Sequence, residues 1–489
     1  MTTRPGQRAG GTVLVVVLVV VAILSVVAIS EMYLARSQAG AQASYRWGQQ
    51  ARAAAMSGIC RAMSALTSEA ELAQDVLDNP VLFQAQRVSD DEDGQPWYFT
   101  VYAENAADPG AHRYGVEDEA GKLNLNFAPP GALAALPGMT AERVDCLLDF
   151  LDGDSDVRDQ GAEQEYYDAL PRPYVINNSP LRTLETLLLV KGFDAMTVLG
   201  EDANRNGLLE PNEDDSDESF PPDDGNGELN LGLTRLATVL TYEPDVDNEG
   251  NPRINIAAPD MVSYQRNLQN AGLDPQTVEF LVRAAENRIP FTDPSQLLGM
   301  TIEVPAGGSG PKPPRPPRPP RPPSAPGGQM QQLSSGVTAA NLSVVMDKLS
   351  CTPPVAGGNR PGGGQAYRVG RVNLNSAPKE VLAALPGLSE TAAQQIVDLR
   401  ETLDAEERST TAWVYAQGVV SAEEFKQAAM CLTARSYQYR VRSFGYSPTC
   451  GRFCVLEAVV DLASGRPEIV YLRDLTRLGP PLAPLGEER

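Results

Sequence analysis

The chain has 489 residues, enough for two or three domains, and carries 40 basic against 63 acidic side chains, a net charge of -23. So large an acidic excess repels nucleic acid and anionic lipid, and it suits a protein exposed to calcium. The single histidine, His112, excludes a histidine-based metal centre or catalytic triad. No GxSxG, HExxH, Walker A or GxGxxG pattern is present, so nothing in the sequence indicates an enzyme.

An uncharged apolar run occupies residues 12–29. As a helix it would span about 27 Å, close to the ~30 Å hydrocarbon core of a bilayer. Because Arg4 and Arg8 precede it, the short N-terminus should stay in the cytoplasm and the rest should be exported. We therefore expect a single-pass protein of a bacterial inner membrane, anchored by residues 12–29, with most of the chain in the periplasm.

Small residues precede the apolar run. A signal peptide has its small-residue cleavage site after the apolar region, whereas here Gly10 and Gly11 lie between Arg8 and the run. This order is typical of a prepilin leader. Residues 1–11 would be removed by prepilin peptidase, leaving Thr12 as the first residue of the mature protein. The alternative is an uncleaved signal anchor.

The apolar run continues into a segment rich in helix-forming residues. Apolar side chains recur at helical spacing in it, at Tyr45, Ala51, Ala55, Ile59, Ala62 and Leu66. The sequence therefore predicts one long helix over residues 12–80. Asn79-Pro80 should end it, because proline cannot extend a helix and biases the residue before it away from helical geometry.

Strand patterns occur near both ends of the exported part. Aromatic and β-branched residues predict strands at 97–103, 113–117, 437–443, 452–461 and 467–472. We expect one antiparallel sheet built from residues 95–119 and 433–475, interrupted by an inserted helical domain at 120–432 and followed by a tail at 476–489. Cys450 and Cys454 flank a predicted turn, where a disulfide is favoured over a metal pair.

The predicted insertion contains an internal repeat. Residues 124–140 align with residues 373–389 with eleven of seventeen positions identical, and a fainter third copy starts at residues 253–259. Ala-Pro starts a helix, Pro-Gly turns the chain, and Thr140 or Ser389 caps the next helix, so each copy predicts a helix–turn–helix hairpin. A further helix is predicted at 178–192, with Gly192 as its stop. The Pro-Pro-Arg segment within 305–328 predicts an extended spacer, and the alternative is a ligand for a peptide-recognition domain.

Residues 202–213 fit the calcium-loop pattern D-x-[DN]-x-[DN]-G-x5-E at every specified position. The candidate ligands are Asp202, Asn204, Asn206, the Leu208 carbonyl, Glu210 and Glu213, the last being bidentate. Because prolines follow at 211, 221 and 222, no exit helix is expected, and the pattern favours a lone stabilising loop. The alternative is an acidic loop exposed to solvent.

Two other acidic segments give weaker signals. The run 149–165 is rich in oxygen ligands but has no recognisable loop pattern, so its spacing leaves calcium and solvated acid equally open. Residues 245–251 start like a calcium loop, but Ile256 stands where the bidentate glutamate belongs, which predicts a turn.

The order of these features resembles the general secretion pathway protein K family, the K-type minor pseudopilins of type II secretion systems. The resemblance spans residues 8–475 discontinuously. The matching stretches are the glycine-then-apolar leader, Gly121–Asn126, Leu151–Asp154 with Gly161–Glu163 and Tyr166-Tyr167, Pro180-Leu181 with Leu187–Phe193, Arg371–Pro378 and the terminal strands.

The resemblance implies a pilin-like α+β fold: a membrane-spanning helix packed on a small antiparallel sheet, with a helical domain of the helix-hairpin-helix or SAM-like kind inserted in the sheet. It implies calcium in that domain, with the acidic block supplying ligands: Asp152, Asp154, Asp156 and Glu163. It also implies assembly at the pseudopilus tip with the I and J minor pseudopilins. Val16, fifth in the mature chain, stands where most pilins have glutamate, the departure expected of K-type subunits.

Two other classes compete with this interpretation. The Pro-Gly hairpins also resemble the helix-hairpin-helix of competence DNA receptors, but the second glycine of that motif is Thr140 in one copy and Ser389 in the other. With a net charge of -23, no nucleic acid is expected as a partner. A minor subunit of a type IV pilus is disfavoured by the large insertion, which a pilus shaft could hardly pack.

Overall fold

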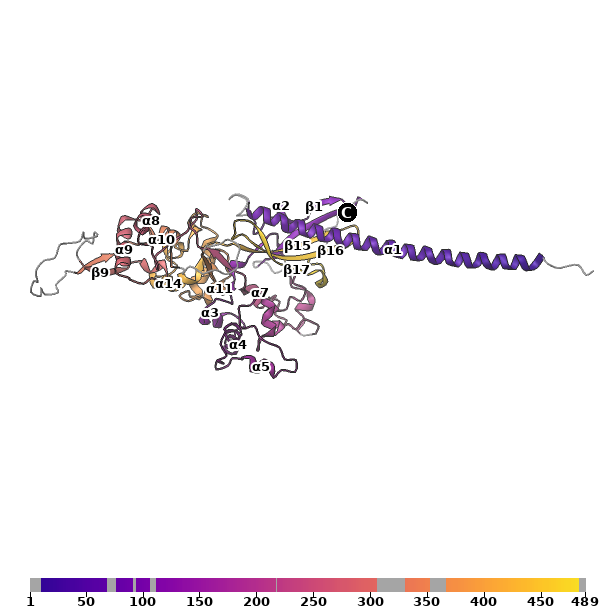
Figure 1. Ribbon diagram of the computed structural model, residues 1–489, viewed down its shortest axis with the longest axis horizontal. Helices are drawn as coiled ribbons and strands as arrows, with labels where there is room; N and C mark the ends of the chain where they lie inside the picture. The colour runs from indigo at the N-terminus through magenta and orange to yellow at the C-terminus, as the bar shows by residue number, and fades with distance from the viewer. Residues whose placement is uncertain are drawn as a thin grey trace, which may run out of the picture.

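The structure, a computed structural model, describes residues 10–67, 76–90, 94–105, 111–216, 218–305, 330–351 and 366–482. Helix α1 (Gly10–Thr67) projects from one end, an antiparallel sheet lies in the middle, and short helices form the other end (Figure 1). The long apolar helix and the antiparallel sheet confirm the predicted α+β, pilin-like fold class. Most of the predicted leader and of the predicted spacer lies outside the described residues.

Helix α1 has an exposed N-terminal half and a partly buried C-terminal half. The side chains of residues 13–29 are all exposed. Within the described part of the chain, α1 alone is long and apolar enough to cross a membrane, with a mean hydropathy of 3.3 in its most apolar window. Gly11 and Thr12, the predicted cleavage site, lie in its first turn.

The predicted end of the long helix is wrong. Helix α1 ends at Thr67, and Asn79-Pro80 begins the short helix α2 (Pro80–Phe83) instead of terminating a helix. Proline fits the first turn of a helix because its missing amide would be unpaired there anyway. The Asn79 side chain accepts a hydrogen bond of 3.2 Å from the amide of Leu82, which caps the new helix.

The sheet has the main strand order β1-β2-β15-β16-β17, with every neighbouring pair antiparallel. The strands are β1 (Gln86–Asp90), β2 (Pro96–Glu104), β15 (Gln438–Ser447), β16 (Arg452–Asp461) and β17 (Glu468–Asp474), with β3 (His112–Arg113) and β4 (Glu117–Asp118) at the sides. β2 precedes the insertion in the sequence and β15 follows it. Because these two strands pair, one sheet is formed from the segments on either side of the insertion.

Four of the five predicted strands are confirmed, and the one at 113–117 is wrong. The chain forms two short strands there, β3 against β2 and β4 against β15. Between them it pairs with another segment: the amide of Asn79 donates to the Tyr114 carbonyl at 2.7 Å, and the amide of Val116 donates to the Val76 carbonyl at 3.0 Å. The backbone bonds of this stretch are therefore divided among three partners.

Small side chains let α1 lie close to the sheet. Ala51, Ala55, Ile59 and Ala62 recur at helical spacing and are fully buried. Opposite them lies Gly445 of β15, where a Cβ atom would stand 2.2 Å from the Ala55 amide nitrogen and 2.3 Å from the Ala51 carbonyl oxygen. The helix backbone therefore rests directly on the strand, which only a glycine permits.

The insertion contains three modules that close in the same way. We call residues 123–238 the first module, 254–350 the middle module and 372–433 the last module. Each begins with a two-residue strand that pairs in parallel with a two-residue strand at its end. The closing hydrogen bonds join Leu125 to Thr238 (2.9 Å), Ile256 to Ser350 (2.8 Å) and Leu374 to Thr433 (3.0 Å).

The first module contains β5 (Leu123–Asn124), α3 (Pro130–Ala135), α4 (Ala141–Leu151), α5 (Gln164–Asp168), η2 (Leu184–Leu189), α6 (Ala195–Leu199), η3 (Pro211–Glu213), α7 (Leu233–Leu236) and β6 (Ala237–Thr238). The middle module contains β8 (Ile254–Asn255), α8 (Tyr264–Asn270), α9 (Pro275–Glu286), η4 (Pro294–Leu297), β9 (Thr301–Pro305), β10 (Met330–Ser334), α10 (Leu342–Lys348) and β11 (Leu349–Ser350). The last module contains β13 (Val372–Asn373), α11 (Lys379–Ala384), α12 (Glu390–Arg400), η5 (Glu407–Ser409), α13 (Trp413–Ala416), α14 (Ala422–Ala428), η6 (Ala429–Cys431) and β14 (Leu432–Thr433). Outside the modules lie η1 (Glu119–Gly121), β7 (Tyr242–Pro244), β12 (Tyr367–Val369) and η7 (Thr476–Leu478).

The predicted hairpins are present in the first and last modules. Helices α3 and α4 form one, and α11 and α12 form the other. Their second helices are capped as expected: Thr140 Oγ1 accepts from the Arg143 amide at 3.2 Å, and Ser389 Oγ accepts from the Ala392 amide at 3.1 Å. The three modules share one continuous apolar core. In Figure 1 their helices lie to the left of the sheet and below it, whereas α1 extends to the right.

The helix predicted at 178–192 is wrong in type and extent. The chain forms the 3₁₀ helix η2, only over Leu184–Leu189. The inward-facing side chains Leu184, Leu187 and Val190 are three residues apart, which matches the three-residue turn of a 3₁₀ helix. Leu188 and Leu189 are exposed.

The predicted disulfide is also absent, since all six cysteines are free thiols. Cys454 is buried between α1 and the sheet, and its sulfur accepts a hydrogen bond of 3.3 Å from the Thr476 hydroxyl. The turn predicted at 245–251 is confirmed, because the amide of Gly250 donates to the Asp247 carbonyl at 3.1 Å.

Candidate functional site

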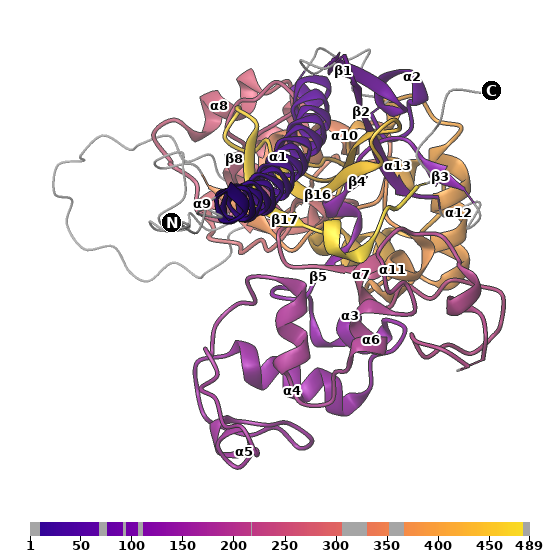
Figure 2. The same cartoon turned by 90° about the vertical axis from the view of Figure 1, so that its right-hand side faces the viewer.

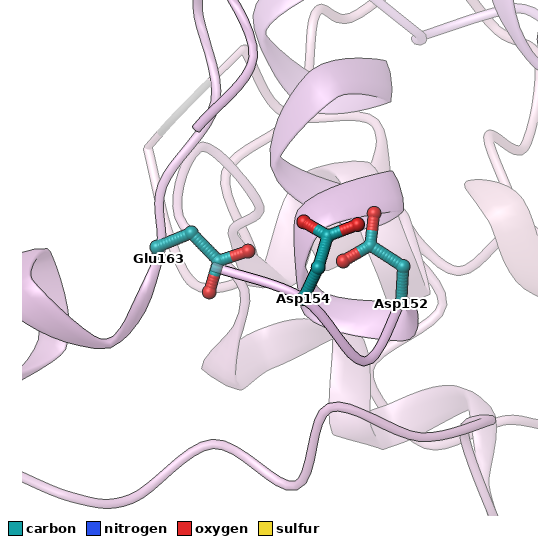
Figure 3. Close-up of side chains that lie close together, drawn as sticks. All are labelled: Asp152, Asp154 and Glu163. Atoms are coloured by element: carbon teal, nitrogen blue, oxygen red, sulfur yellow. The ribbon is translucent and has the colours of Figure 1, made fainter. Parts of the chain in front are cut away.

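Three carboxylates of the acidic run converge at the end of helix α4. Asp152 is the C-cap residue of α4, Asp154 follows in the loop, and Glu163 is the N-cap residue of α5. One oxygen from each lies within 4.8 Å of the others. In Figure 3 the carboxylates of Asp152 and Asp154 lie beside each other, and that of Glu163 points toward them from the neighbouring segment.

Several oxygen atoms of this cluster are buried and have no hydrogen-bond partner. They are both carboxylate oxygens of Glu163 and Oδ1 of Asp152. Oδ1 of Asn178, whose side-chain nitrogen donates to the Asp154 carbonyl, is buried and unpaired as well. Glu163 is only 4% exposed, and burial together with the charges of Asp149 and Asp152 raises its pKa. Unpaired buried oxygens are costly, and a hard cation such as Ca²⁺, which takes six to eight oxygen ligands, would satisfy them. The residues present therefore fit calcium.

Two residues hold the loop in this shape. The guanidinium of Arg158 lies 2.5 Å from Asp149 and 2.7 Å from Asp152, so one cation ties the helix to the loop and leaves Oδ1 of Asp152 free. Gly161 passes close to Asp149, where a Cβ atom would lie 1.9 Å from the carboxylate oxygen. This close contact explains why the Gly-Ala-Glu motif has a glycine at position 161, since any side chain there would displace Asp149.

The structure brings together Asp152, Asp154 and Glu163 of the predicted ligands, but not Asp156. Asp156 is not part of the cluster: it is exposed, and its amide donates to Asp154 at 2.9 Å. Asn178 was not predicted, although its amide group donates to the Asp154 carbonyl at 3.2 Å and its oxygen is one of the unpaired atoms. Asn178 has a φ of +41°, and asparagine favours that conformation, but the sequence does not reveal which loop it approaches.

The predicted calcium loop at 202–213 folds as a closed loop against the sheet. Oδ1 and Oδ2 of Asp202 accept from the amides of Asn206 and Gly207, both at 2.9 Å. Glu213 reaches back across the loop, accepting from the amides of Ala203 and Glu210, each at 3.1 Å. The loop is fixed to the sheet through the Asn206 carbonyl, which lies 2.7 Å from the His112 ring nitrogen in β3.

The candidate ligands of this loop converge but are already hydrogen-bonded. The side-chain amide groups of Asn204 and Asn206 donate to the two carboxylate oxygens of Glu210, at 2.9 and 3.1 Å. The Leu208 amide donates to Asn206 at 2.7 Å. Glu213 is 1% exposed, and burial raises its pKa to about 7. A buried carboxylate whose charge is disfavoured fits a cation site, but the unpaired oxygens found beside Glu163 are not seen here.

The hairpin turns do not offer a free phosphate site. At Gly387 a Cβ atom would stand 2.5 Å from the Glu424 carbonyl of α14, so this turn packs against another helix. At the other turn, the Gly138 carbonyl accepts a hydrogen bond from the Arg143 guanidinium. This turn therefore presents a backbone acceptor to Arg143, whereas a phosphate site would need backbone amide donors. A DNA phosphate at the Gly387 turn would have to displace α14.

The long helix over an antiparallel sheet, with helical modules between the strands, defines a pilin-like protein with an inserted helical domain. Residues 131–199 and 372–433 match two family models, both described as type II secretion system (T2SS), protein K. Two segments of the chain are therefore similar to the type II secretion system protein K family. The matched ranges fall in the first and last modules, and neither includes the middle module.

No curated protein matches the sequence. Among solved structures, the GspK-GspI-GspJ complex from the type 2 secretion system of enterotoxigenic Escherichia coli contains a chain with 12% identity, covering 90% of this chain and 98% of that one. The TM-score of this match is 0.39.

Proposed function

We propose that this protein is the minor pseudopilin at the tip of a type II pseudopilus, where it initiates or caps the filament during protein export across the outer membrane. The observation that carries the proposal is the pair of protein K segments inserted in a pilin-like helix and sheet. The proposed role is structural, with no chemical step.

The exposed half of α1 supports a membrane anchor that later becomes a filament contact. Residues 13–29 are apolar and exposed, so they need either lipid or neighbouring helices. We propose that they span the inner membrane once, with the rest of the chain in the periplasm. Prepilin peptidase would cut between Gly11 and Thr12. N-terminal sequencing of the membrane-extracted protein should find Thr12, and a Met1 terminus or one beyond Ser30 would refute processing at this site.

Val16 supports a place at the filament end. A glutamate at the fifth mature position can neutralise the terminal amine of the subunit ahead, whereas the valine side chain offers no such charge. Thr12 can still present its amine to the next subunit. A subunit that receives a neighbour on one side only belongs at the end of a filament.

The inserted modules support the same place on grounds of bulk. Viewed along α1, the first module extends well to one side of the sheet (Figure 2). A subunit of this shape repeated at each step of a shaft would collide with its neighbours. One copy at the end avoids this collision.

The partners we propose are the I- and J-type minor pseudopilins, and cross-linking tests both partners and position. Leu24 is 61% exposed on α1 and suits a cysteine, in a Cys60→Ser background that removes the exposed native thiol. Leu24→Cys should cross-link to I- or J-type subunits and rarely to itself. Abundant self-cross-links, or labelling along whole filaments, would exclude the tip. A cysteine at exposed Glu423 of α14 serves as the matched control and should give none of these products.

We also propose that calcium stabilises the inserted domain. The ligands would be Asp152, Asp154, Glu163 and Asn178 at one site, and Asp202, Asn204, Asn206, the Leu208 carbonyl, Glu210 and Glu213 at the other. Calcium would neutralise buried carboxylates at both sites. It would fix the loop between α4 and α5 at the first site and the 202–213 loop, which rests on β3, at the second. The unpaired oxygens at Glu163 give the first site the stronger support.

A further inference from the structure

A cavity of about 580 Å³ lies where the sheet, the first module and the last module meet. This volume is in the range of small-molecule sites. Its walls include Arg442 and Glu457 from the sheet, Thr183 from the first module and Ser376 from the last module. Nine basic and seven acidic side chains line it, a positive excess within a chain whose net charge is -23.

Two basic side chains of the cavity, both from β15, are held by carboxylates: Arg440 lies 2.6 Å from Glu119, and Arg442 lies 2.8 Å from Glu117 and 3.0 Å from Glu457. These cations are neutralised within the protein. They form the wall of the cavity and leave no charge for a ligand.

Arg400 and Arg408 of the last module have no such partner. Neither forms an ion pair among the described residues, and Nε of Arg408 is buried without a hydrogen-bond partner. Arg400 donates only to backbone carbonyls, those of Leu374 at 3.4 Å and Ala377 at 2.6 Å. Burial and the nearby charge of Arg408 lower the pKa of Arg400, although Glu401, also on the cavity wall, acts in the opposite direction.

The repeat brings a third arginine to the same cavity. In the last module the Asn375 amide donates to the Arg408 carbonyl at 3.0 Å, and in the first module the corresponding Asn126 amide donates to the Leu181 carbonyl at 3.0 Å. Arg182, the residue after Leu181, also lines the cavity, is exposed and forms no ion pair among the described residues. Equivalent loops of two modules thus place arginines around one space.

We propose that this cavity binds a small anion with a carboxylate or phosphate group, held by Arg400 and Arg408, with Arg182 at the solvent side. A guanidinium binds both groups through paired N–H donors and stays charged at any physiological pH. An anion would supply the counter-charge that Arg400 and Arg408 lack and a partner for the buried Nε. Because each module contributes a loop, the bound anion would also join the first module to the last.

The test is calorimetric titration of the full-length protein in detergent, with calcium removed so that neither probe is sequestered. Succinate represents the carboxylate source and inorganic phosphate the phosphate source, each measured against sodium chloride at matched ionic strength. We expect saturable binding of at least one probe at one site per chain. Competition between the two probes identifies which group is preferred. If neither shows saturable binding above the chloride control, the cavity is not an anion site.

Variants locate the binding. Arg400→Gln with Arg408→Gln should weaken binding of the preferred probe at least tenfold. Because Arg400 also bonds to the backbone, Arg182→Gln provides a second test at an exposed position, where we expect about a threefold loss and an unchanged circular dichroism spectrum. Arg283→Gln, on the outside of α9 in the middle module, should bind as the wild type does. The proposal is overturned if Arg182→Gln and the folded Arg400→Gln, Arg408→Gln double variant both bind the probe with the affinity of the wild type. The anion would then bind elsewhere.

Discussion

Arg440 of β15 and Glu119 of η1 form an ion pair of 2.6 Å at the joint between the sheet and the inserted modules. The Glu119 side chain is completely buried, and it also accepts from the Thr238 hydroxyl of the first module. Arg440 in turn lies 2.9 Å from Glu457 of β16. The joint between anchor and insertion is therefore ionic, and its strength depends on pH.

Acid should loosen this joint. Burial alone would raise the pKa of Glu119, but Arg440 and Lys122 outweigh it and hold the pKa at about 2, below the ordinary value of 4.5. A carboxyl group with a lowered pKa in the folded state contributes stability above its unfolded pKa and loses it as the pH falls toward 2. Glu119→Gln should cost about 3 kcal/mol near pH 7 and progressively less below pH 4.5, measured by urea unfolding. Glu423→Gln, an exposed residue of α14, should change neither value, and a pH-independent cost at Glu119 would contradict the argument.

Calcium should stabilise the wild type through the Glu163 cluster. At a concentration 100 times its Kd, a ligand that binds only the native state adds about 2.7 kcal/mol. Glu163→Gln and Asn178→Ala should each reduce the calcium-dependent rise of the thermal midpoint, because each removes an unpaired oxygen. Asp156→Asn is the matched control and should keep the full rise, since Asp156 lies outside the cluster. If Asp156→Asn reduced the calcium-dependent rise as much as Glu163→Gln does, calcium would be acting through the overall negative charge of the loop and not through a defined site.

The 202–213 loop should add a separate calcium effect. Glu213→Gln removes the bidentate position of the loop, so the thermal midpoint should rise less with calcium than in the wild type. The exposed Glu228→Gln should behave as the wild type. Combined with Glu163→Gln, the losses should add, because the two sites share no residue. A full calcium response in Glu213→Gln would show that this loop holds itself closed without metal.

Gly445 should tolerate no side chain. In Gly445→Ala the added methyl group would meet backbone atoms of Ala51 and Ala55, and the helix would have to move off the sheet. We expect a loss of about 3 kcal/mol or more in unfolding free energy and loss of the packing between α1 and β15. Gly131→Ala, where the new methyl group meets nothing within 4 Å, should be neutral or slightly stabilising. An equally small effect at both positions would show that helix and sheet are not in direct contact.

Local patterns predicted much of this architecture. The apolar run, the strands at 97–103 and 452–461 and the capped hairpins depend on side-chain periodicity and on residues within a few positions of each other, so the sequence alone reveals them. The family resemblance followed from the same local motifs. The errors arose where local patterns compete with distant contacts, as at 113–117, where residues 76–79 take up backbone bonds that a continuous strand would need.

Only the tertiary structure decided which acidic residues gather. Asp152, Asp154 and Asp156 are equivalent in the sequence, but the ion pair to Arg158 and the turn after Asp154 leave two facing Glu163 and one facing solvent. Asn178 joins them from a separate loop. The cavity arginines were likewise invisible in the sequence, because Arg182 and Arg408 line one cavity only when two modules pack together. Periodicity records which face of an element is buried, but the partner across a gap is set by packing between segments far apart in the chain.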